Sequence, residues 1–237
     1  MPSRLTTGAA LLGAALGSLI HASAAQPLHQ VYRSGAERIP DARHSDIRHL
    51  DRVYSMPEYA HPAAWHERAE WLRAHVRASA GLLPWPEDRP AVAAQVFDRF
   101  VGDGFSVEKV YFESRPGLYV TGNLYRPTEG DGPFPAVACP HGHWPHGRLH
   151  DDQRGSVPGR CIGMARRGMV ALSYDMIGYV DADQMDHRWS DPRLDLWGIS
   201  VGGLQTLNGV RVLDFLAALP DVDPSRLAVT GASGGGT

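Results

Sequence analysis

This chain has few cysteines, a small net charge and no long apolar run, and each of these features excludes some classes of protein. Two cysteines among 237 residues, Cys139 and Cys161, allow one disulfide at most. Because a free cysteine behaves as a small core hydrophobe, we expect two separately buried thiols. A net charge of −3 gives no reason to expect nucleic acid or an anionic membrane as a partner. A hydrophobic content of 43% with 21% charged residues is typical of a globular protein.

The apolar run near the start, residues 8–20, is too short to span a bilayer. Arg4 precedes this run, and the small residues Ala22 and Ala24 follow it in a small-x-small pattern. This combination predicts a signal peptide over residues 1–25 that is removed on export. We therefore expect a periplasmic or secreted protein without membrane contact after cleavage, the alternative being an uncleaved signal anchor.

Residues 26–105 are expected to form a partly helical N-terminal extension. Pro62 suits the first turn of a helix and Gly81 suits its C-terminal cap. The apolar positions of this helix recur at helical spacing: Trp65, Ala69, Leu72 and Val76. A second helical stretch is predicted around Ala91–Phe100. We expect the extension to pack on the domain that follows it.

From residue 106 onward the pattern changes to strands that alternate with helices. A hairpin over residues 107–125, with its turn at 115–117, is predicted at the edge of a sheet. Three buried strands follow, predicted at residues 136–139, 170–174 and 227–230. Helical segments at 157–167 and 204–219 separate them. This alternation predicts an α/β fold with a mainly parallel sheet, helices on both faces and ligands at the carboxyl ends of the strands.

A nucleophile motif follows the last predicted strand. Residues 231–235 read Gly-Ala-Ser-Gly-Gly, which matches the pattern G-x-S-x-G. This motif forms a tight turn from strand to helix that presents a serine hydroxyl at the end of a sheet. The alternative is a glycine-rich surface loop, because the chain has 26 glycines. The strand before the motif favours Ser233 as a catalytic nucleophile.

The loop after the first buried strand reads Pro140-His-Gly-His-Trp144. We assign its backbone N–H at His143, together with that of Gly234, as the donors that stabilise an oxyanion. His141 is expected to hold the loop in place by hydrogen bonds rather than to act as a base. The spacing of His141, His143, His146 and His150 also allows a metal site. Since no cysteine is near and the loop already has an explanation, we expect no metal and no cofactor.

The loop after the second buried strand begins with Asp175. A carboxylate there could be a triad acid, but we expect it to brace the neighbouring loops. His187 lies in the stretch of acidic and aromatic residues at 181–189. Like several aromatic residues, it is a candidate to line a substrate pocket. The alternative for each of them is packing in the core. The aromatic candidates are Trp144, Tyr179, Trp189 and Trp197.

Four segments together resemble exported bacterial α/β-hydrolases of the acetylxylan esterase type. The segments are Pro140-His-Gly-His-Trp144, Tyr174-Asp-Met-Ile-Gly-Tyr179, Leu196-Trp-Gly-Ile-Ser200 and Gly231-Ala-Ser-Gly-Gly-Gly236. Dienelactone hydrolases and prolyl-oligopeptidase catalytic domains are related to this group, and the resemblance covers about residues 60–237. It implies an α/β-hydrolase fold with Ser233 as nucleophile, His143 and Gly234 as oxyanion donors, and no cofactor. It also implies a carboxylic ester hydrolase that removes acyl groups from acetylated or similarly esterified plant polysaccharide fragments.

The position of Ser233 in the chain creates a difficulty. In α/β-hydrolases the acid and the histidine of the triad follow the serine, whereas here only three glycines and a threonine follow it. We therefore expect residues 106–237 to be the N-terminal half of a hydrolase domain whose C-terminal half is absent, and the chain alone to be inactive. A base from an upstream position is the alternative.

Two other functions remain open at this stage. A prolyl-oligopeptidase-type peptidase would use the same nucleophile, but it usually carries a large N-terminal domain for which residues 26–105 are too few. A non-catalytic carbohydrate-binding relative would keep the fold without the chemistry. An esterase would have a small-molecule or oligosaccharide ester as its substrate.

Overall fold

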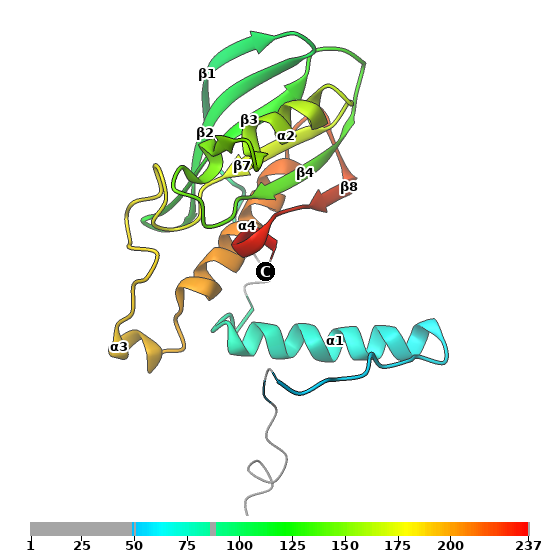
Figure 1. Cartoon of the computed structure of the whole chain (residues 1–237), viewed down its shortest axis with the longest axis vertical. Helices are drawn as coiled ribbons and strands as arrows, with labels where there is room; N and C mark the ends of the chain where they lie inside the picture. Colours follow the sequence, from blue (N-terminus) through cyan, green and yellow to red (C-terminus); the bar gives the residue numbers. More distant parts are fainter. Residues whose placement is uncertain (1–48, 50, 86–88, 237) are drawn as a thin grey trace, which may run out of the picture. The chain divides into compact units, whose positions relative to one another are not determined.

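A mixed sheet of six strands organises the chain between residues 95 and 229, in the spatial order β1-β2-β3-β7-β4-β8 (Figure 1). The computed structural model describes residue 49 and residues 51–85 and 89–236, and the sheet belongs to the compact unit Tyr59–Thr237. The strands are β1 Gln95–Gly102, β2 Phe105–Arg115, β3 Leu118–Pro127, β4 Phe134–Pro140, β7 Val170–Tyr174 and β8 Val222–Val229. The predicted signal peptide, residues 1–25, lies outside the described residues.

The remaining elements connect or flank these strands. They are α1 Pro62–Ser79, η2 Gly147–Leu149, β5 Asp151–Asp152, β6 Gly155–Ser156, α2 Val157–Ala165, α3 Pro192–Asp195, α4 Val201–Ala217 and η3 Ser233–Gly236. In the part of the chain that the structure describes, no helix is both long enough and apolar enough to cross a bilayer.

The sheet has an antiparallel part and a parallel part. β1, β2, β3 and β7 are antiparallel neighbours in turn, and β4 lies parallel to both β7 and β8. The parallel part consists of the three later strands predicted from the sequence, and the predicted hairpin is β2 and β3. The carboxyl ends of the parallel strands meet at one edge of the sheet, as the pairing of Pro140 with Tyr174 shows.

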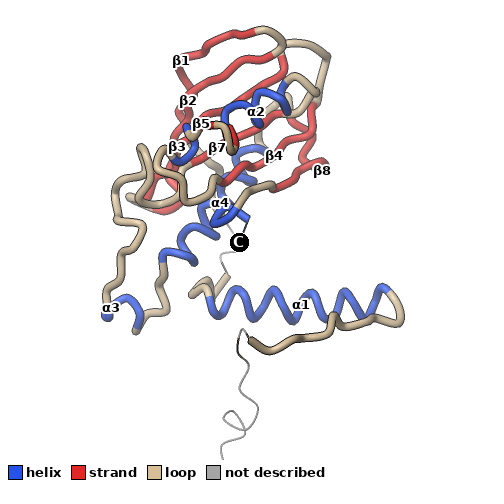
Figure 2. The backbone as a smooth tube through the Cα atoms, viewed as in Figure 1, coloured by secondary structure: helices blue, strands red, loops and turns tan. Residues whose placement is uncertain are grey.

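One helix covers each face of the sheet (Figures 1 and 2). Side chains alternate between the faces along a strand. On β4, Ala136 and Ala138 belong to the core cluster that includes Leu216 of α4. Val137 belongs to the opposite cluster, which includes Ala165 of α2. The predicted arrangement of helices on both faces is therefore confirmed.

Both cysteines are free and buried, as expected, but they are not separate. Cys139 on β4 and Cys161 on α2 lie in the same core cluster. A hydrogen bond with the Cys139 thiol, together with burial, raises the pKa of the Cys161 thiol.

Helix α1 begins at Pro62, as the sequence predicts. The ring nitrogen Nδ1 of His61 caps this end by accepting a hydrogen bond from the Ala64 N–H at 3.2 Å. Gly81, at φ +69°, follows the last turn. Of the apolar row on this helix, Ala69 is buried, whereas Trp65 is 47% exposed.

The predicted helix around Ala91–Phe100 is wrong. Residues 95–102 form strand β1, which pairs with β2 through a two-residue turn, Asp103-Gly104. An Asp-Gly pair between apolar, β-branched segments is a strong hairpin signal, because the glycine readily takes a positive φ, here +73°. β1 also lies outside the predicted hairpin, so β2 and β3 are not the edge of the sheet.

The prediction of a buried strand at 227–230 holds for the strand but not for its burial. β8 is the outermost strand at its end of the described sheet, and Val229 is 57% exposed. Leu227 packs against the core cluster under α4. The exposure arises because, within the described residues, neither a strand beyond β8 nor a further helix covers it.

Candidate functional site

The predicted nucleophile lies in a strained turn directly beyond β8. Ser233 begins η3 and has φ +54°, in the left-handed region that non-glycine residues rarely occupy. Strain of this kind concentrates at functional sites, and the nucleophile elbow of α/β-hydrolases is such a sharp turn. The backbone geometry therefore fits the elbow interpretation rather than an ordinary surface loop.

The glycines of the motif are required by close backbone contacts. A Cβ atom at Gly235 would lie 2.5 Å from the carbonyl oxygens of Pro140 and His141. A Cβ atom at Gly231 would lie 1.9 Å from the carbonyl oxygen of Gly235. The elbow therefore packs against the loop after β4 so closely that only glycine fits at these two positions.

Substitution of Gly235 by alanine is expected to destabilise the protein by about 1–3 kcal/mol, because the added methyl group meets two backbone carbonyls that cannot rotate away. Gly236→Ala is the matched control, since a Cβ there comes no closer than 3.4 Å to any atom. We expect the control to change stability by less than about 0.5 kcal/mol. Urea unfolding of both variants measures the difference, and equal midpoints would contradict the packing described.

The loop after β4 lies against the turn at Ser233. A Cβ atom at Gly142 would lie 3.2 Å from the Ser233 Cβ, so this loop touches the nucleophile turn. The backbone N–H groups of His143 and Gly234 have no hydrogen-bond partner among the described residues. Two unpaired N–H groups next to a serine are what an oxyanion hole requires. Their role, like that of Ser233, stays a prediction.

His141 holds this loop to its neighbour, as expected. Its ring is fully buried, and Nε2 accepts a hydrogen bond from the Met176 N–H at 3.0 Å. Nδ1 lies 2.7 Å from the Gly142 carbonyl oxygen, so Nδ1 carries the proton and donates it. Burial lowers the pKa of this ring to about 4. A neutral imidazole with a hydrogen bond at each ring nitrogen holds the loop in place and does not act as a base.

Replacing His141 with glutamine is expected to change how stability depends on pH. The pKa of His141 is about 4 in the folded chain against 6.5 for a free side chain. Between these values the unfolded chain binds more protons, so lowering the pH favours unfolding. As the pH falls from about 6.5 to about 4, the free energy of unfolding of the wild type should fall by about 3 kcal/mol more than that of the variant. Urea unfolding across this range tests it, and a constant difference between the two proteins would contradict it.

A cluster of rings lies over the elbow. The His143 ring occupies the space beside Gly234, where a Cβ would lie 2.2 Å from its Cε1 atom. Nε2 of His143 is 2.9 Å from Nε2 of His187, and Tyr179 stands edge-on to His187 with ring centroids 5.0 Å apart. His143 is exposed, while Tyr179 and His187 are half-buried. The structure thus brings together two residues predicted near the substrate with the predicted oxyanion loop.

A buried arginine, which sequence reasoning missed, joins the loops around the site. Arg148 is 6% exposed and donates to Asn123 Oδ1 at 2.7 Å, to Asp181 Oδ2 at 2.6 Å and to Asp175 Oδ2. Asp175 also accepts from the Thr121 hydroxyl at 2.7 Å. Burial raises the pKa of the Asp175 carboxyl to about 6, against the opposing effect of Arg148. Asp175 is therefore the brace that the sequence predicts.

Three of the four histidines of the 141–150 loop have different partners. His141 bonds to Met176, His143 to His187, and His150 stacks on Trp144 with the ring planes at 11°. Among the described residues, no group of three or more histidine, cysteine or acidic side chains is placed to hold a metal ion.

Two of the four aromatic residues predicted to line a substrate pocket show no contact with the elbow cluster. Trp189 is half-buried and Trp197 is 80% exposed beyond α3. Within the described residues, no ring contact joins either one to His143 or Tyr179. The other two, Trp144 and Tyr179, lie close to the elbow. A contact with substrate stays a prediction for all four.

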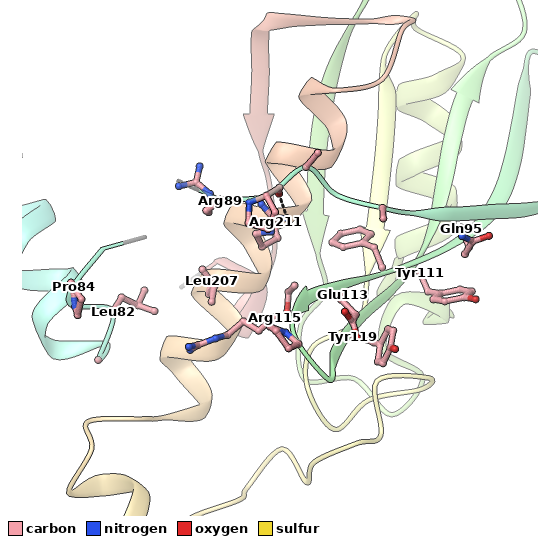
Figure 3. Close-up of a pocket in the computed structure, with 17 residues that line it drawn as sticks. Leu82, Pro84, Arg89, Gln95, Tyr111, Glu113, Arg115, Tyr119, Leu207 and Arg211 are labelled. Atoms are coloured by element: carbon pink, nitrogen blue, oxygen red, sulfur yellow. Dashed lines mark hydrogen bonds between the residues drawn. The ribbon is translucent and has the colours of Figure 1, made fainter. Parts of the chain in front are cut away.

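A cavity among the described residues lies elsewhere and contains no predicted site residue. Its volume is about 710 Å³, and Figure 3 shows it between α4, the end of α1 and the β2–β3 hairpin. Labelled residues that line it include Leu82, Arg115, Tyr119, Leu207 and Arg211. The cavity therefore adds nothing to the site at Ser233.

Comparisons with known proteins identify the fold. No family model and no curated protein matches the chain. The solved structure of the methylesterase BT1017 matches 75% of the chain at 31% identity and a TM-score of 0.60. A candidate acetyl xylan esterase of Bacteroides fragilis matches 73% at 19% identity and a TM-score of 0.58. The chain spans 38% and 48% of the lengths of these two proteins. The α/β-hydrolase fold predicted from the sequence is confirmed, and the chain resembles esterases with this fold.

Proposed function

We propose that this α/β-hydrolase-fold chain carries the nucleophile and the oxyanion donors of a carboxylic ester hydrolase. The observation that supports the proposal is the left-handed turn at Ser233, packed against a loop whose His143 N–H is unpaired. The elbow raises the hydroxyl at the carboxyl edge of the parallel strands, where ligands of such sheets bind.

The chemistry is acyl transfer. The Ser233 hydroxyl oxygen attacks the carbonyl carbon of an ester, the bond between that carbon and the alcohol oxygen breaks, and the hydroxyl proton ends on the departing alcohol. The negative charge that develops on the carbonyl oxygen is stabilised by the N–H groups of Gly234 and His143. Water then releases the acid from the acyl-enzyme. Each oxyanion donor is worth about 3 kcal/mol of barrier lowering in enzymes of this type.

The substrate class that we propose is a small ester on a plant polysaccharide fragment, with acetylated sugars first. Two similar solved structures carry the names of a methylesterase and an acetyl xylan esterase. These names support a carbohydrate ester as the substrate class. The rings of His143, His187 and Tyr179 offer an accessible surface beside Ser233 on which sugar hydroxyls could find hydrogen-bond partners.

Covalent labelling with a fluorophosphonate tests the proposal, on a protein that joins this chain to the acid and histidine expected of the hydrolase domain. We expect one label, mapped to Ser233 by mass spectrometry of the digested protein. Acetate release from acetylated xylan, methanol release from methyl-esterified pectin and cleavage of a proline-containing peptide then separate the ester classes from a peptidase. A chain that takes no label, or takes it elsewhere, would contradict the proposal and favour a carbohydrate-binding relative.

A further inference from the structure

The hydrogen bonds of His187 decide which of its nitrogens carries a proton. Nδ1 lies 2.9 Å from the carbonyl oxygen of Ile177. A carbonyl oxygen only accepts, so Nδ1 must donate, and the neutral ring therefore keeps an unshared electron pair on Nε2. The backbone also holds His187 in place, because a Cβ at Gly178 would lie 2.2 Å from the His187 nitrogen.

The tautomer of His187 in turn determines the tautomer of His143. Their Nε2 atoms are 2.9 Å apart, a hydrogen bond that needs one proton between them. Since Nε2 of His187 offers the electron pair, Nε2 of His143 supplies the proton. The neutral His143 ring is then left with an unprotonated Nδ1, a hydrogen-bond acceptor.

This acceptor lies next to the nucleophile and belongs to an exposed side chain. A Cβ at Gly234 would lie 2.5 Å from Nδ1 of His143, so this nitrogen flanks the residue after Ser233. The His143 side chain is exposed, and among the described residues no hydrogen bond uses its Nδ1. A group of a ligand bound at Ser233 can therefore reach it.

We propose that His143 selects ester substrates that carry a free hydroxyl beside the ester, and that His187 is the positioning residue that sets the His143 tautomer. This inference rests on the proposed esterase function of Ser233. An unprotonated Nδ1 accepts a hydrogen bond from a sugar hydroxyl, whereas a methyl ether at the same place has no proton to donate. A partly acetylated sugar unit with a free neighbouring hydroxyl is thus preferred over a fully substituted one.

Nitrogen NMR of the histidine rings tests the tautomers without any activity. At about pH 8, where histidine is ordinarily neutral, we expect the proton of His143 on Nε2 and that of His187 on Nδ1. In His187→Ala the His143 ring loses its fixed partner and should report a mixture of both tautomers. His146→Ala is the matched control, an exposed histidine of the same loop outside the ring cluster. A wild-type His143 protonated on Nδ1, or already a mixture, would overturn the inference.

Substrate preference tests the consequence. In the protein that joins this chain to the expected acid and histidine, we expect the wild type to hydrolyse an acetylated xyloside with a free neighbouring hydroxyl about three- to tenfold faster, in kcat/KM, than its methyl ether. This factor corresponds to the free energy of one neutral hydrogen bond. His143→Ala and His187→Ala should both lose this preference, which is the ratio of two kcat/KM values measured on the same variant and so does not depend on its overall rate, and His146→Ala should keep it. A preference that survives in His143→Ala would overturn the inference and leave the esterase proposal intact. Absence of a label on Ser233 would refute the esterase proposal, and the NMR result would still stand.

Discussion

In a protein that joins this chain to the acid and histidine expected of the hydrolase domain, replacing Ser233 with alanine is expected to lower ester hydrolysis by about three orders of magnitude or more and to abolish fluorophosphonate labelling. The nucleophile of an acyl-transfer enzyme forms the bond that breaks the ester, so its removal leaves only what the oxyanion donors contribute. Turnover of p-nitrophenyl acetate, measured under single-turnover conditions, gives the loss.

The matched control is Ser190→Ala, which removes the hydroxyl of an exposed serine outside the elbow. It should keep the wild-type rate, and both variants should keep the wild-type midpoint of thermal unfolding. If Ser233→Ala hydrolyses ester as fast as Ser190→Ala, Ser233 is not the nucleophile and the proposed function is wrong.

Replacing Arg148 with methionine is expected to cost about 3–5 kcal/mol of stability. The substitution removes the guanidinium that faces Asp175, a carboxyl group that is 1% exposed, and so leaves a buried charge without its partner. Because a domain has a total stability of only about 5–15 kcal/mol, this loss is large. Urea unfolding near neutral pH measures it.

Two controls separate the lost charge from the lost side chain. Arg154→Met changes an arginine whose side chain is 93% exposed and should shift stability by less than about 0.5 kcal/mol. In Arg148→Met/Asp175→Asn no unpaired charge remains, so most of the loss should be recovered, and this variant folds even if the single one does not.

The pH adds a third check on the same pair. Burial raises the pKa of Asp175 to about 6, and a protonated carboxyl needs no counter-charge. Since Arg148 itself lowers this pKa, the pKa of Asp175 is higher still in Arg148→Met, so the cost of the substitution should shrink as the pH falls towards about 6 and stay small below it. A cost that is equal at pH 5 and pH 8 would show that Arg148 acts through packing alone.

Local backbone preferences explain what the sequence by itself determined. The start of α1 at Pro62, the β2–β3 hairpin and the elbow at Ser233 follow from residues within a few positions of one another. The glycines around Ser233 restrict the turn because the backbone there leaves no room for a Cβ. Strand β1 could also have been predicted, since Asp103-Gly104 is a hairpin signal. The spacing of the apolar residues before this turn fits a helix as well, and the helix was predicted.

Only the tertiary structure decided which side chains meet at the carboxyl edge of the sheet. Arg148 reaches Asp175 across 27 residues of chain, and His143 reaches His187 across 44. Nothing in the local pattern selects these partners, because the order of β7 and β4 in the sheet, and not their spacing in sequence, brings the loops together. Burial then gives the contacts their chemistry: it keeps His141 neutral and raises the pKa of Asp175. The sequence thus determined which residues are available, and the packing of the loops, by choosing their partners and removing water, determined what each one can do.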